Sequence, residues 1–193
     1  MRIAAIVLAA GRGRRAGGPK ALLRHGAVTF LDRVVTILSR PGVDRVVVVL
    51  GADAARVREG SALPDAALVV VNERPEDGML ASILAGLAAA EADGADAILV
   101  HPVDHPLVAA ATVDRVTGAL RAGSVVAVPT HAGRRGHPGA FARAAWPALR
   151  AAPPSEGARA VLAAHPEWIA HVEGDPGCVA GIDTPEDYRR LIG

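Results

Sequence analysis

A glycine-rich basic segment follows the first apolar run of the chain, and its residue types favour the binding of phosphate groups. Gly11 and Gly13 let backbone N–H groups approach an anion closely, because glycine has no side chain in the way. Four positively charged side chains lie in the same segment: Arg12, Arg14, Arg15 and Lys20. A triphosphate needs both features, so we expect residues 11–20 to bind one.

Lys20 is distinctive because it is the only lysine in a chain whose other permanently charged basic residues are arginines. A compact ammonium acts as a point charge between phosphate oxygens, whereas a guanidinium offers a planar fork of donors. We therefore predict that Lys20 contacts the phosphates directly.

Two other nucleotide-binding motifs share parts of this pattern and fit it less well. The spacing of residues 11–16 matches a dinucleotide fingerprint, which should open directly into a helix and precede an acid at the end of the second strand. Residues 17–19 instead prolong the loop, and residues 50–52 contain no acid. A P-loop needs Gly-Lys-Ser/Thr where this chain has Gly18-Pro19-Lys20. A solvated basic turn is the remaining alternative.

Two aspartates follow apolar segments and are candidate metal ligands. Asp104 comes shortly after the run at residues 97–100, and Asp183 follows the strand-like residues 178–182. A magnesium ion that bridges phosphates usually takes one or two carboxylates and several waters, so the pair is predicted to hold Mg²⁺. The alternatives are that Asp104 forms a turn before a proline and that Asp183 only marks the entry to a helix capped by Thr184.

His101 and His105 flank Asp104 at a spacing that raises the question of a zinc site. Pro102 and Pro106 interrupt any helical presentation of these side chains, and no cysteine is near them in the sequence. Zinc is therefore disfavoured here.

Short β-branched runs that alternate with Ala/Leu-rich segments must position these groups. We predict strands at residues 2–9, 45–50, 67–71, 97–101 and 125–129, and helices at 30–40, 52–59, 80–92, 111–122 and 157–164. The strands are continuous apolar runs, as expected when helices cover both faces of a sheet. Strand–helix alternation indicates an α/β fold with a doubly wound, mainly parallel sheet, in which ligands bind beyond the carboxyl ends of the strands.

Helix starts and loops can also be predicted locally. Thr29 and Asp32 have capping spacing at the start of the first helix, and Thr184-Pro185 opens another helix near the C-terminus. Residues 150–155, which contain two consecutive prolines, are predicted to form a loop.

Composition restricts the class of protein. The 193 residues suit one domain over positions 1–193, and 51% of them are hydrophobic, which excludes a disordered chain. The net charge of +1 gives no electrostatic case for nucleic acid or an anionic membrane as partner. Residues 3–10 fit a buried strand better than a signal peptide, and the single cysteine, Cys178, forms no internal disulfide. We expect a cytoplasmic protein with a buried structural thiol.

The glycine-rich segment also resembles a known family. Leu8-Ala9-Ala10-Gly11, then Arg15, Gly17 and Pro19-Lys20, is similar to the LAAGxxxRMGxxK loop of the MobA/MocA-like NTP transferases, with Ala16 where methionine is usual. The resemblance covers essentially the whole chain and implies a three-layer α/β/α sandwich with a mixed, Rossmann-like nucleotidyltransferase sheet. It also implies that one set of residues binds the nucleotide through this loop: Leu8, Ala10, Gly11, Gly13, Arg14, Arg15 and Lys20.

Later segments extend the resemblance. The segment around Asp104 resembles the family's Gly-Asp-Gln-Pro-Leu motif, with Val103 and His105 as departures, and residues 182–187 resemble its Ile-Asp-Thr-Pro-Glu-Asp motif. In the family these aspartates hold the metal. The resemblance further implies that Asn72, Gly78 and Ser82 lie near the base, and that Arg135 and His137, in an Arg-Gly-His-Pro-like motif, line the acceptor side.

The implied reaction is transfer of a nucleoside monophosphate from an NTP to a phosphorylated acceptor, with release of pyrophosphate. Arg15 and Lys20 are expected to neutralise the developing negative charge, with Mg²⁺ as cofactor. The Leu-Ala-Ala-Gly form resembles the CTP-using branch, which implies molybdopterin as acceptor. The alternatives are a sugar-phosphate nucleotidylyltransferase that uses UTP or another NTP, an NAD(P)-dependent oxidoreductase, and a non-catalytic nucleotide-binding module.

Overall fold

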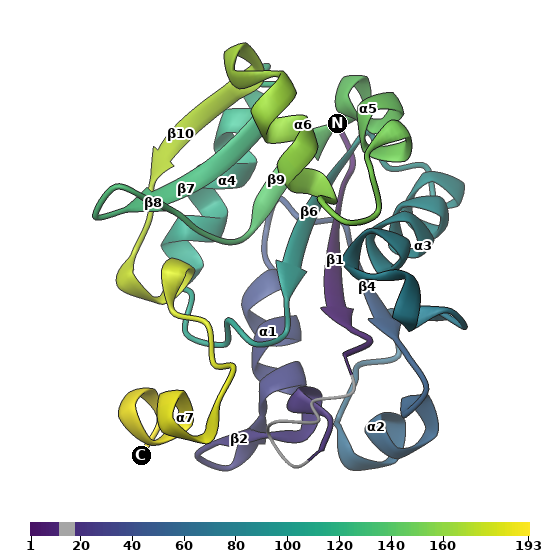
Figure 1. Cartoon of the computed structure of the whole chain (residues 1–193), viewed down its shortest axis with the longest axis vertical. Helices are drawn as coiled ribbons and strands as arrows, with labels where there is room; N and C mark the ends of the chain where they lie inside the picture. The colour runs from purple at the N-terminus through teal and green to yellow at the C-terminus, as the bar shows by residue number, and fades with distance from the viewer. Residues whose placement is uncertain (12–17) are drawn as a thin grey trace.

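A computed structural model of the chain describes residues 1–11 and 18–193 (Figure 1). Four predicted phosphate-binding residues therefore lie outside the described residues: Arg12, Gly13, Arg14 and Arg15. Within the described part, eight strands form one sheet, in the order β10-β7-β9-β6-β1-β4-β5, with β8 paired to β7.

The bounds of the strands follow the predicted apolar runs closely. The five predicted strands are β1 (Ile3–Ala9), β4 (Arg45–Leu50), β5 (Leu68–Val71), β6 (Ala97–Pro102) and β7 (Val126–His131). Every residue of β1 and β6 is buried, as the continuous apolar runs predict. β1 lies between β4 and β6 and is parallel to both, so the strand that precedes the glycine-rich segment is central in the sheet.

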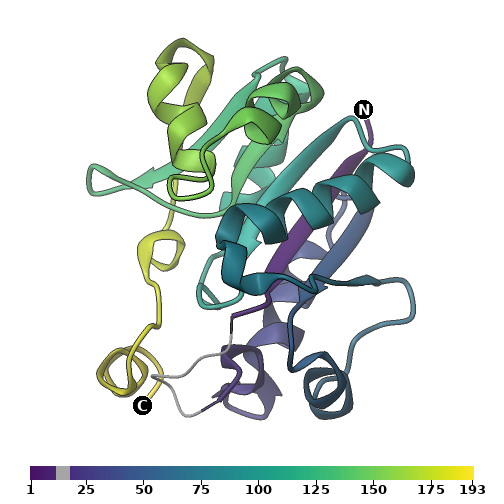
Figure 2. The same cartoon turned by 45° about the vertical axis from the view of Figure 1, so that its right-hand side comes forward.

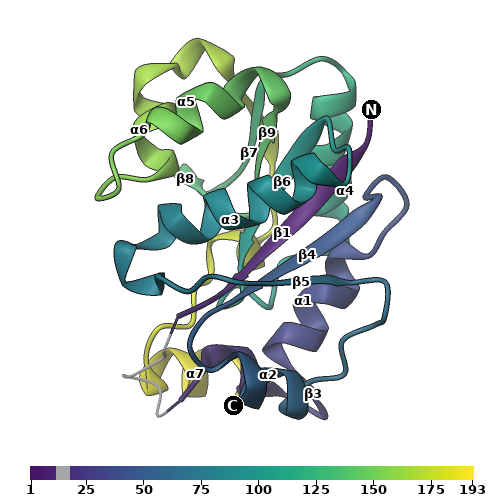
Figure 3. The same cartoon turned by 90° about the vertical axis from the view of Figure 1, so that its right-hand side faces the viewer.

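Helices cover both faces and complete a three-layer α/β/α sandwich, which confirms the predicted fold class (Figure 3). On one face lie α3 (Met79–Ala92), α5 (Trp146–Ala151) and α6 (Ala158–Ala164). On the other face lie α1 (Phe30–Leu38), α4 (Ala110–Arg121) and α2 (Ala54–Gly60). Each layer has its own apolar core against the sheet.

Local sequence signals set the helix starts. The Thr29 hydroxyl accepts a hydrogen bond from the Asp32 N–H at the start of α1, which confirms the predicted cap. The C-terminal helix α7 (Pro185–Leu191) begins with a capping box between Thr184 and Asp187, also as predicted. Figure 2 shows α7 at the same end of the molecule as the short hairpin β2 (Arg24–His25) and β3 (Val28–Thr29), and the Tyr188 hydroxyl donates to the Arg24 carbonyl at 2.7 Å.

α3 lies unusually close to the sheet because Gly86 faces it. A Cβ added at Gly86 would lie 3.0 Å from Val49 Cγ2 and closer still to Ile6 Cγ2. The glycine therefore sets how near α3 comes to β1 and β4, and with it the position of the N-terminus of α3.

The prediction missed three strands and the end of one helix. β8 (Arg134–Arg135) and β9 (Gly139–Ala142) were not predicted, and β9 is antiparallel to both β6 and β7, while β10 (Ile169–Glu173) extends the edge. β8 is a two-residue strand that pairs with the nearby end of β7, whereas β9 and β10 are short and pair with strands more distant in the sequence. Residues 150–155 are not all loop, because α5 continues to Ala151 before the two prolines end it.

The strand-like interpretation of residues 178–182 was also wrong. The chain forms the 3₁₀ turn η6 (Pro176–Val179) there, because the Asp175 carboxylate accepts the Gly177 N–H at 2.7 Å and Pro176 occupies the first turn position. Cys178 is buried, as predicted, and burial raises the pKa of its thiol to about 11. Of the helices among the described residues, none has the length and apolar character needed to cross a bilayer.

Candidate functional site

A cavity of about 250 Å³ lies where β1 and β6 end and α3 begins. Its lining residues are Leu8, Ala10, Gly11, Lys20, Pro75, Gly78, Met79, Ser82, Pro102, Val103 and Asp104. The described residues predicted to contact the nucleotide are all in this list except Asn72. The cavity therefore lies beyond the carboxyl ends of parallel strands, where open α/β sheets bind ligands.

Lys20 and Asp104 line this cavity, and the second predicted metal ligand, Asp183, contacts Lys20. The Lys20 ammonium Nζ lies 2.8 Å from Asp104 Oδ2 and 2.5 Å from Asp183 Oδ1. The side chains of Lys20 and Asp104 are 18% and 22% exposed, whereas that of Asp183 is 69% exposed. Burial alone would lower the pKa of Lys20, but hydrogen bonds and charges from both carboxylates outweigh it and raise that pKa. The lysine is therefore a fixed cation held between two acids.

Backbone contacts bring the two aspartates together from distant parts of the chain. Asp104 follows β6, and Asp183 precedes α7. The Ile182 N–H donates to the Asp104 carbonyl at 2.9 Å, which joins the two segments directly.

The donor set fits a divalent cation of the Mg²⁺ type. Carboxylate oxygens are the ligands that such hard cations prefer. The Lys20 ammonium lies between the two carboxylates, which shows that this position favours a positive charge. Over the residues that the structure describes, no three or more His, Cys, Asp or Glu side chains form a metal-binding group. Water and phosphate oxygens must therefore complete the coordination of any ion that the two aspartates hold.

The N-terminus of α3 forms the opposite wall of the cavity. Gly78 caps this helix with φ of 96°, a left-handed value that glycine adopts without strain. The backbone N–H groups of a helix N-terminus attract acceptor and anionic groups. The cavity is thus lined by backbone N–H donors at the start of α3 and by the charged side chains of Lys20 and Asp104.

Ser82 and Asn72 are linked, with Asn72 behind the cavity wall. The Arg74 N–H donates to Asn72 Oδ1 at 3.0 Å, which fixes the orientation of the amide. Asn72 Nδ2 therefore donates to Ser82 Oγ, also at 3.0 Å. Because Ser82 accepts this bond, its own hydroxyl hydrogen is available to a ligand in the cavity. In the structure Asn72 orients Ser82, and its predicted contact with the nucleotide stays a prediction.

His137 and Arg135, the predicted acceptor residues, occupy different environments. The His137 ring lies 4.7 Å from that of His105 and 6.3 Å from that of His101, measured between centroids. Burial lowers the pKa of His137 to about 3, so this ring is neutral at physiological pH. His137 is therefore no part of a solvated basic loop, whereas Arg135 is exposed on β8.

The histidine cluster of His101, His105 and His137 was not predicted from the sequence. His101 Nε2 lies 3.0 Å from the His105 carbonyl, so this nitrogen carries the proton and donates. The three residues come from β6, the loop after it and the loop before β9. Only His101 and His105 are close in the sequence, so no local signal indicated the group.

Asp175 positions the segment that leads to Asp183. Its carboxylate accepts hydrogen bonds from the Thr112 hydroxyl, the Ala109 N–H and the Gly177 N–H, at 2.5, 2.9 and 2.7 Å. Burial alone would raise the pKa of Asp175, but these hydrogen bonds outweigh it and lower that pKa. Asp175 thereby joins the start of α4 to η6.

Asp175→Ala is expected to lower the free energy of unfolding by about 2 kcal/mol at neutral pH, because it removes hydrogen bonds to a charged acceptor. The folded-state pKa is depressed, so this stabilisation is present above the unfolded pKa of about 3.9 and is lost as the pH falls through the folded value. Urea unfolding at several pH values measures the difference. Asp114→Ala, which removes an exposed partner of Arg40, is the control. An equal loss in both variants would contradict the assignment.

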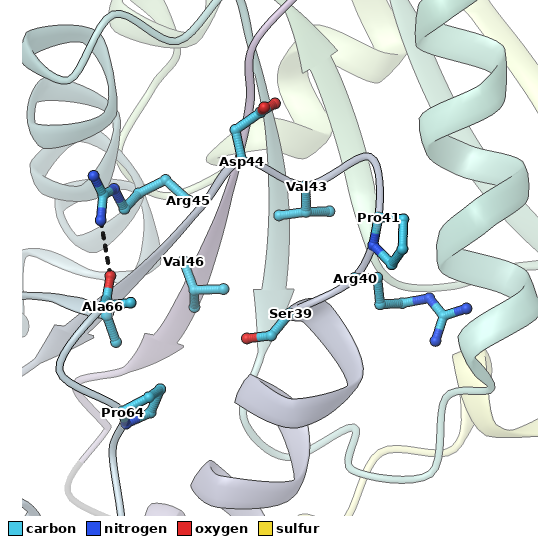
Figure 4. Close-up of a pocket in the computed structure, with 10 residues that line it drawn as sticks. Ser39, Arg40, Pro41, Val43, Asp44, Arg45, Val46, Pro64 and Ala66 are labelled. Carbon is cyan, nitrogen blue, oxygen red and sulfur yellow. Dashed lines mark hydrogen bonds between the residues drawn. The ribbon is translucent and has the colours of Figure 1, made fainter.

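A second cavity, of about 280 Å³, lies near the amino end of β4 (Figure 4). Its charged residues already have protein partners. Arg45 donates to the Ala66 carbonyl at 2.9 Å, Arg40 pairs with Asp114 at 2.7 Å, and Asp44 accepts the Ile3 N–H at 2.8 Å. We therefore place the candidate functional site at the first cavity.

Comparisons with known proteins show the family of this chain. A family model for the MobA-like NTP transferase domain matches residues 5–169. Nicotine blue oxidoreductase from Paenarthrobacter nicotinovorans is 33% identical, and the match covers 98% of this chain and 96% of that protein. Molybdenum cofactor guanylyltransferase from Rhodobacter capsulatus is 32% identical, with coverage of 98% and 95%.

Solved structures show the same architecture. The crystal structure of Rv0371c from Mycobacterium tuberculosis H37Rv has a TM-score of 0.88 and 32% identity, and the match covers 100% of this chain and 98% of that chain. A structure of Rv0371c in complex with manganese has a TM-score of 0.79 and 31% identity, with the same coverage of 100% and 98%.

Proposed function

Because the chain belongs to the MobA-like NTP transferase family, we propose that it transfers a nucleoside monophosphate from an NTP to a phosphorylated small molecule. The observation that carries this proposal is the cavity in which Lys20 and Asp104 face the N-terminus of α3. A triphosphate needs a cation, carboxylates that can hold a metal ion, and backbone donors, and residues of these three kinds lie together here.

In the proposed reaction an oxygen of the acceptor phosphate attacks the α-phosphorus of the NTP. The bond between the α-phosphorus and the bridging oxygen breaks, and pyrophosphate leaves with the electron pair. The protein supplies no covalent nucleophile, so its residues align the reactants and stabilise negative charge. Lys20 neutralises charge on the phosphates, and Arg15 is proposed to do the same on sequence grounds alone.

Asp104 and Asp183 are proposed to hold a divalent cation, Mg²⁺ in the cell. Such a cation, when bound, would act as a Lewis acid and stabilise the negative charge of the phosphate oxygens. The manganese complex of the related Rv0371c supports a metal-binding role for this fold. In the structure both aspartates contact Lys20, so their carboxylates favour positive charge at this side of the cavity.

The nucleotide is proposed to be CTP. Ala10 lines the cavity and has a methyl group where glycine would have none, which favours a smaller base, and the Ser82 hydroxyl is free to donate. Cytosine offers the acceptors O2 and N3 to such a donor. GTP is the competing nucleotide, because one relative is named a guanylyltransferase.

The acceptor is proposed to carry a phosphate, with molybdopterin as the first compound to test. Support comes from the relative named for the molybdenum cofactor. Arg135 is an exposed cation suited to an acceptor phosphate, and His137 packs in the neighbouring histidine cluster.

A specific observation favours a second candidate function. The relative named nicotine blue oxidoreductase matches over nearly the full length of both chains. An oxidoreductase on this fold would bind NAD or NADP at the same cavity and would need no divalent ion.

A ligand panel separates the two functions. Thermal unfolding is measured with each of the four NTPs plus Mg²⁺, and with NAD, NADP and their reduced forms. The proposed function predicts stabilisation by an NTP that depends on Mg²⁺, followed by pyrophosphate release when acceptor is added. Stabilisation by a nicotinamide dinucleotide alone would establish the second function, and NTP binding without pyrophosphate release from any acceptor would indicate a binding module.

A further inference from the structure

The Lys20 ammonium occupies the position that a cation between Asp104 and Asp183 would take. We propose that Lys20 is the built-in counter-ion of the metal site, so that a divalent ion binds only when Lys20 leaves the two carboxylates. This inference rests on the proposed function, because it assigns these aspartates to the metal. It adds that metal binding and nucleotide binding are coupled through one lysine.

The contacts of Lys20 support this role. Its Nζ touches Asp104 Oδ2 and Asp183 Oδ1 at 2.8 and 2.5 Å, and these partners lie 84 and 163 positions away in the sequence. The Lys20 side chain is only 18% exposed. It therefore holds the segment after β6 and the segment before α7 together in the absence of metal.

An ammonium and a divalent ion compete for the same oxygen lone pairs and also repel each other. Metal binding must therefore break both ion pairs of Lys20. The triphosphate offers the released ammonium new oxygens, so nucleotide offsets this cost. By linkage, the metal binds weakly alone and tightly with NTP, and the nucleotide gains the same factor from the metal.

The first experiment measures Mn²⁺ affinity by electron paramagnetic resonance in the absence of nucleotide. Lys20→Met keeps the length of the side chain and removes its charge, so it is expected to bind Mn²⁺ about tenfold more tightly than the wild type. Arg40→Met is the matched control, because it removes another ion-paired cation near the opposite end of the sheet. Equal or weaker Mn²⁺ binding by Lys20→Met would overturn the proposal.

The second experiment uses the wild-type protein and does not depend on folding of a variant. Lys20 is the only lysine, so acetylation at its Nζ can be followed by mass spectrometry, with the N-terminal amine as internal control. Mn²⁺ is expected to raise the rate of Lys20 acetylation several-fold, because the ammonium leaves its carboxylates. An unchanged or slower rate with saturating Mn²⁺ would show that Lys20 stays in place.

The experiments distinguish failure of the counter-ion role of Lys20 from failure of the proposed nucleotidyl transfer. If the wild type releases pyrophosphate but Mn²⁺ neither competes with Lys20 nor exposes it, the counter-ion role is wrong and the proposed function stands. If Mn²⁺ displaces Lys20 but no NTP is bound or turned over, the counter-ion role stands and the proposed function is wrong.

Discussion

Asp104→Asn is expected to lower the turnover number about 100-fold or more at saturating NTP and Mg²⁺, the scale of losing one preorganised charge contact. Asp104 is the less exposed of the two aspartates and lines the cavity, so solvent compensates poorly for its loss. The cost to stability is much smaller, about 1 kcal/mol, because the Lys20 pair is still partly solvated. Pyrophosphate release and thermal unfolding measure the two effects.

Two variants serve as controls for Asp104→Asn. Asp114→Asn removes an exposed ion-paired carboxylate far from the cavity and should keep its turnover. The turnover number of Asp183→Asn should lie between those of Asp104→Asn and Asp114→Asn. The Asp183 side chain is 69% exposed, so water can replace part of its contact with the ion. Wild-type turnover in Asp104→Asn would remove this residue from the reaction.

Lys20→Met is expected to lower the turnover number by about 100-fold or more as well, since the phosphates lose the cation that neutralises their developing charge. The same variant is expected to bind Mn²⁺ more tightly. Slower chemistry together with tighter metal binding is a combination that general unfolding cannot produce. Steady-state pyrophosphate release at saturating NTP measures the turnover.

Arg40→Met controls for the change in net charge, and its turnover number is expected to equal that of the wild type. Its ion pair with Asp114 lies between α1 and α4, away from the cavity. If Lys20→Met keeps the turnover of Arg40→Met, Lys20 has no part in stabilising the reacting phosphates.

The order of elements was predictable because it depends on near neighbours in the chain. Val46, Val47 and Val48 belong to a continuous apolar run, and such a run is buried wherever a sheet is covered on both faces. The caps at Thr29 and Thr184 join residues three positions apart, so their spacing alone indicated where α1 and α7 begin.

Features that depend on distant partners were not predictable in this way. β9 has four residues, and its antiparallel place between β6 and β7 is decided by pairing of Phe141 with both strands. The histidine cluster likewise combines residues from β6 and from two separate loops. The turn at Cys178 is different, because Asp175 accepts the Gly177 N–H only two positions away, a local signal that the strand-like composition concealed.

The sequence by itself determined the apolar strands, the helix caps and the residue types that suit phosphate and metal, since each of these follows from a side chain and its near neighbours. Only the tertiary structure decided that Lys20 lies between Asp104 and Asp183, and that Asn72 orients Ser82 from behind the cavity wall. The physical reason is that such contacts arise when the sheet brings strand ends together, and the pairing of those strands is a property of the whole folded chain.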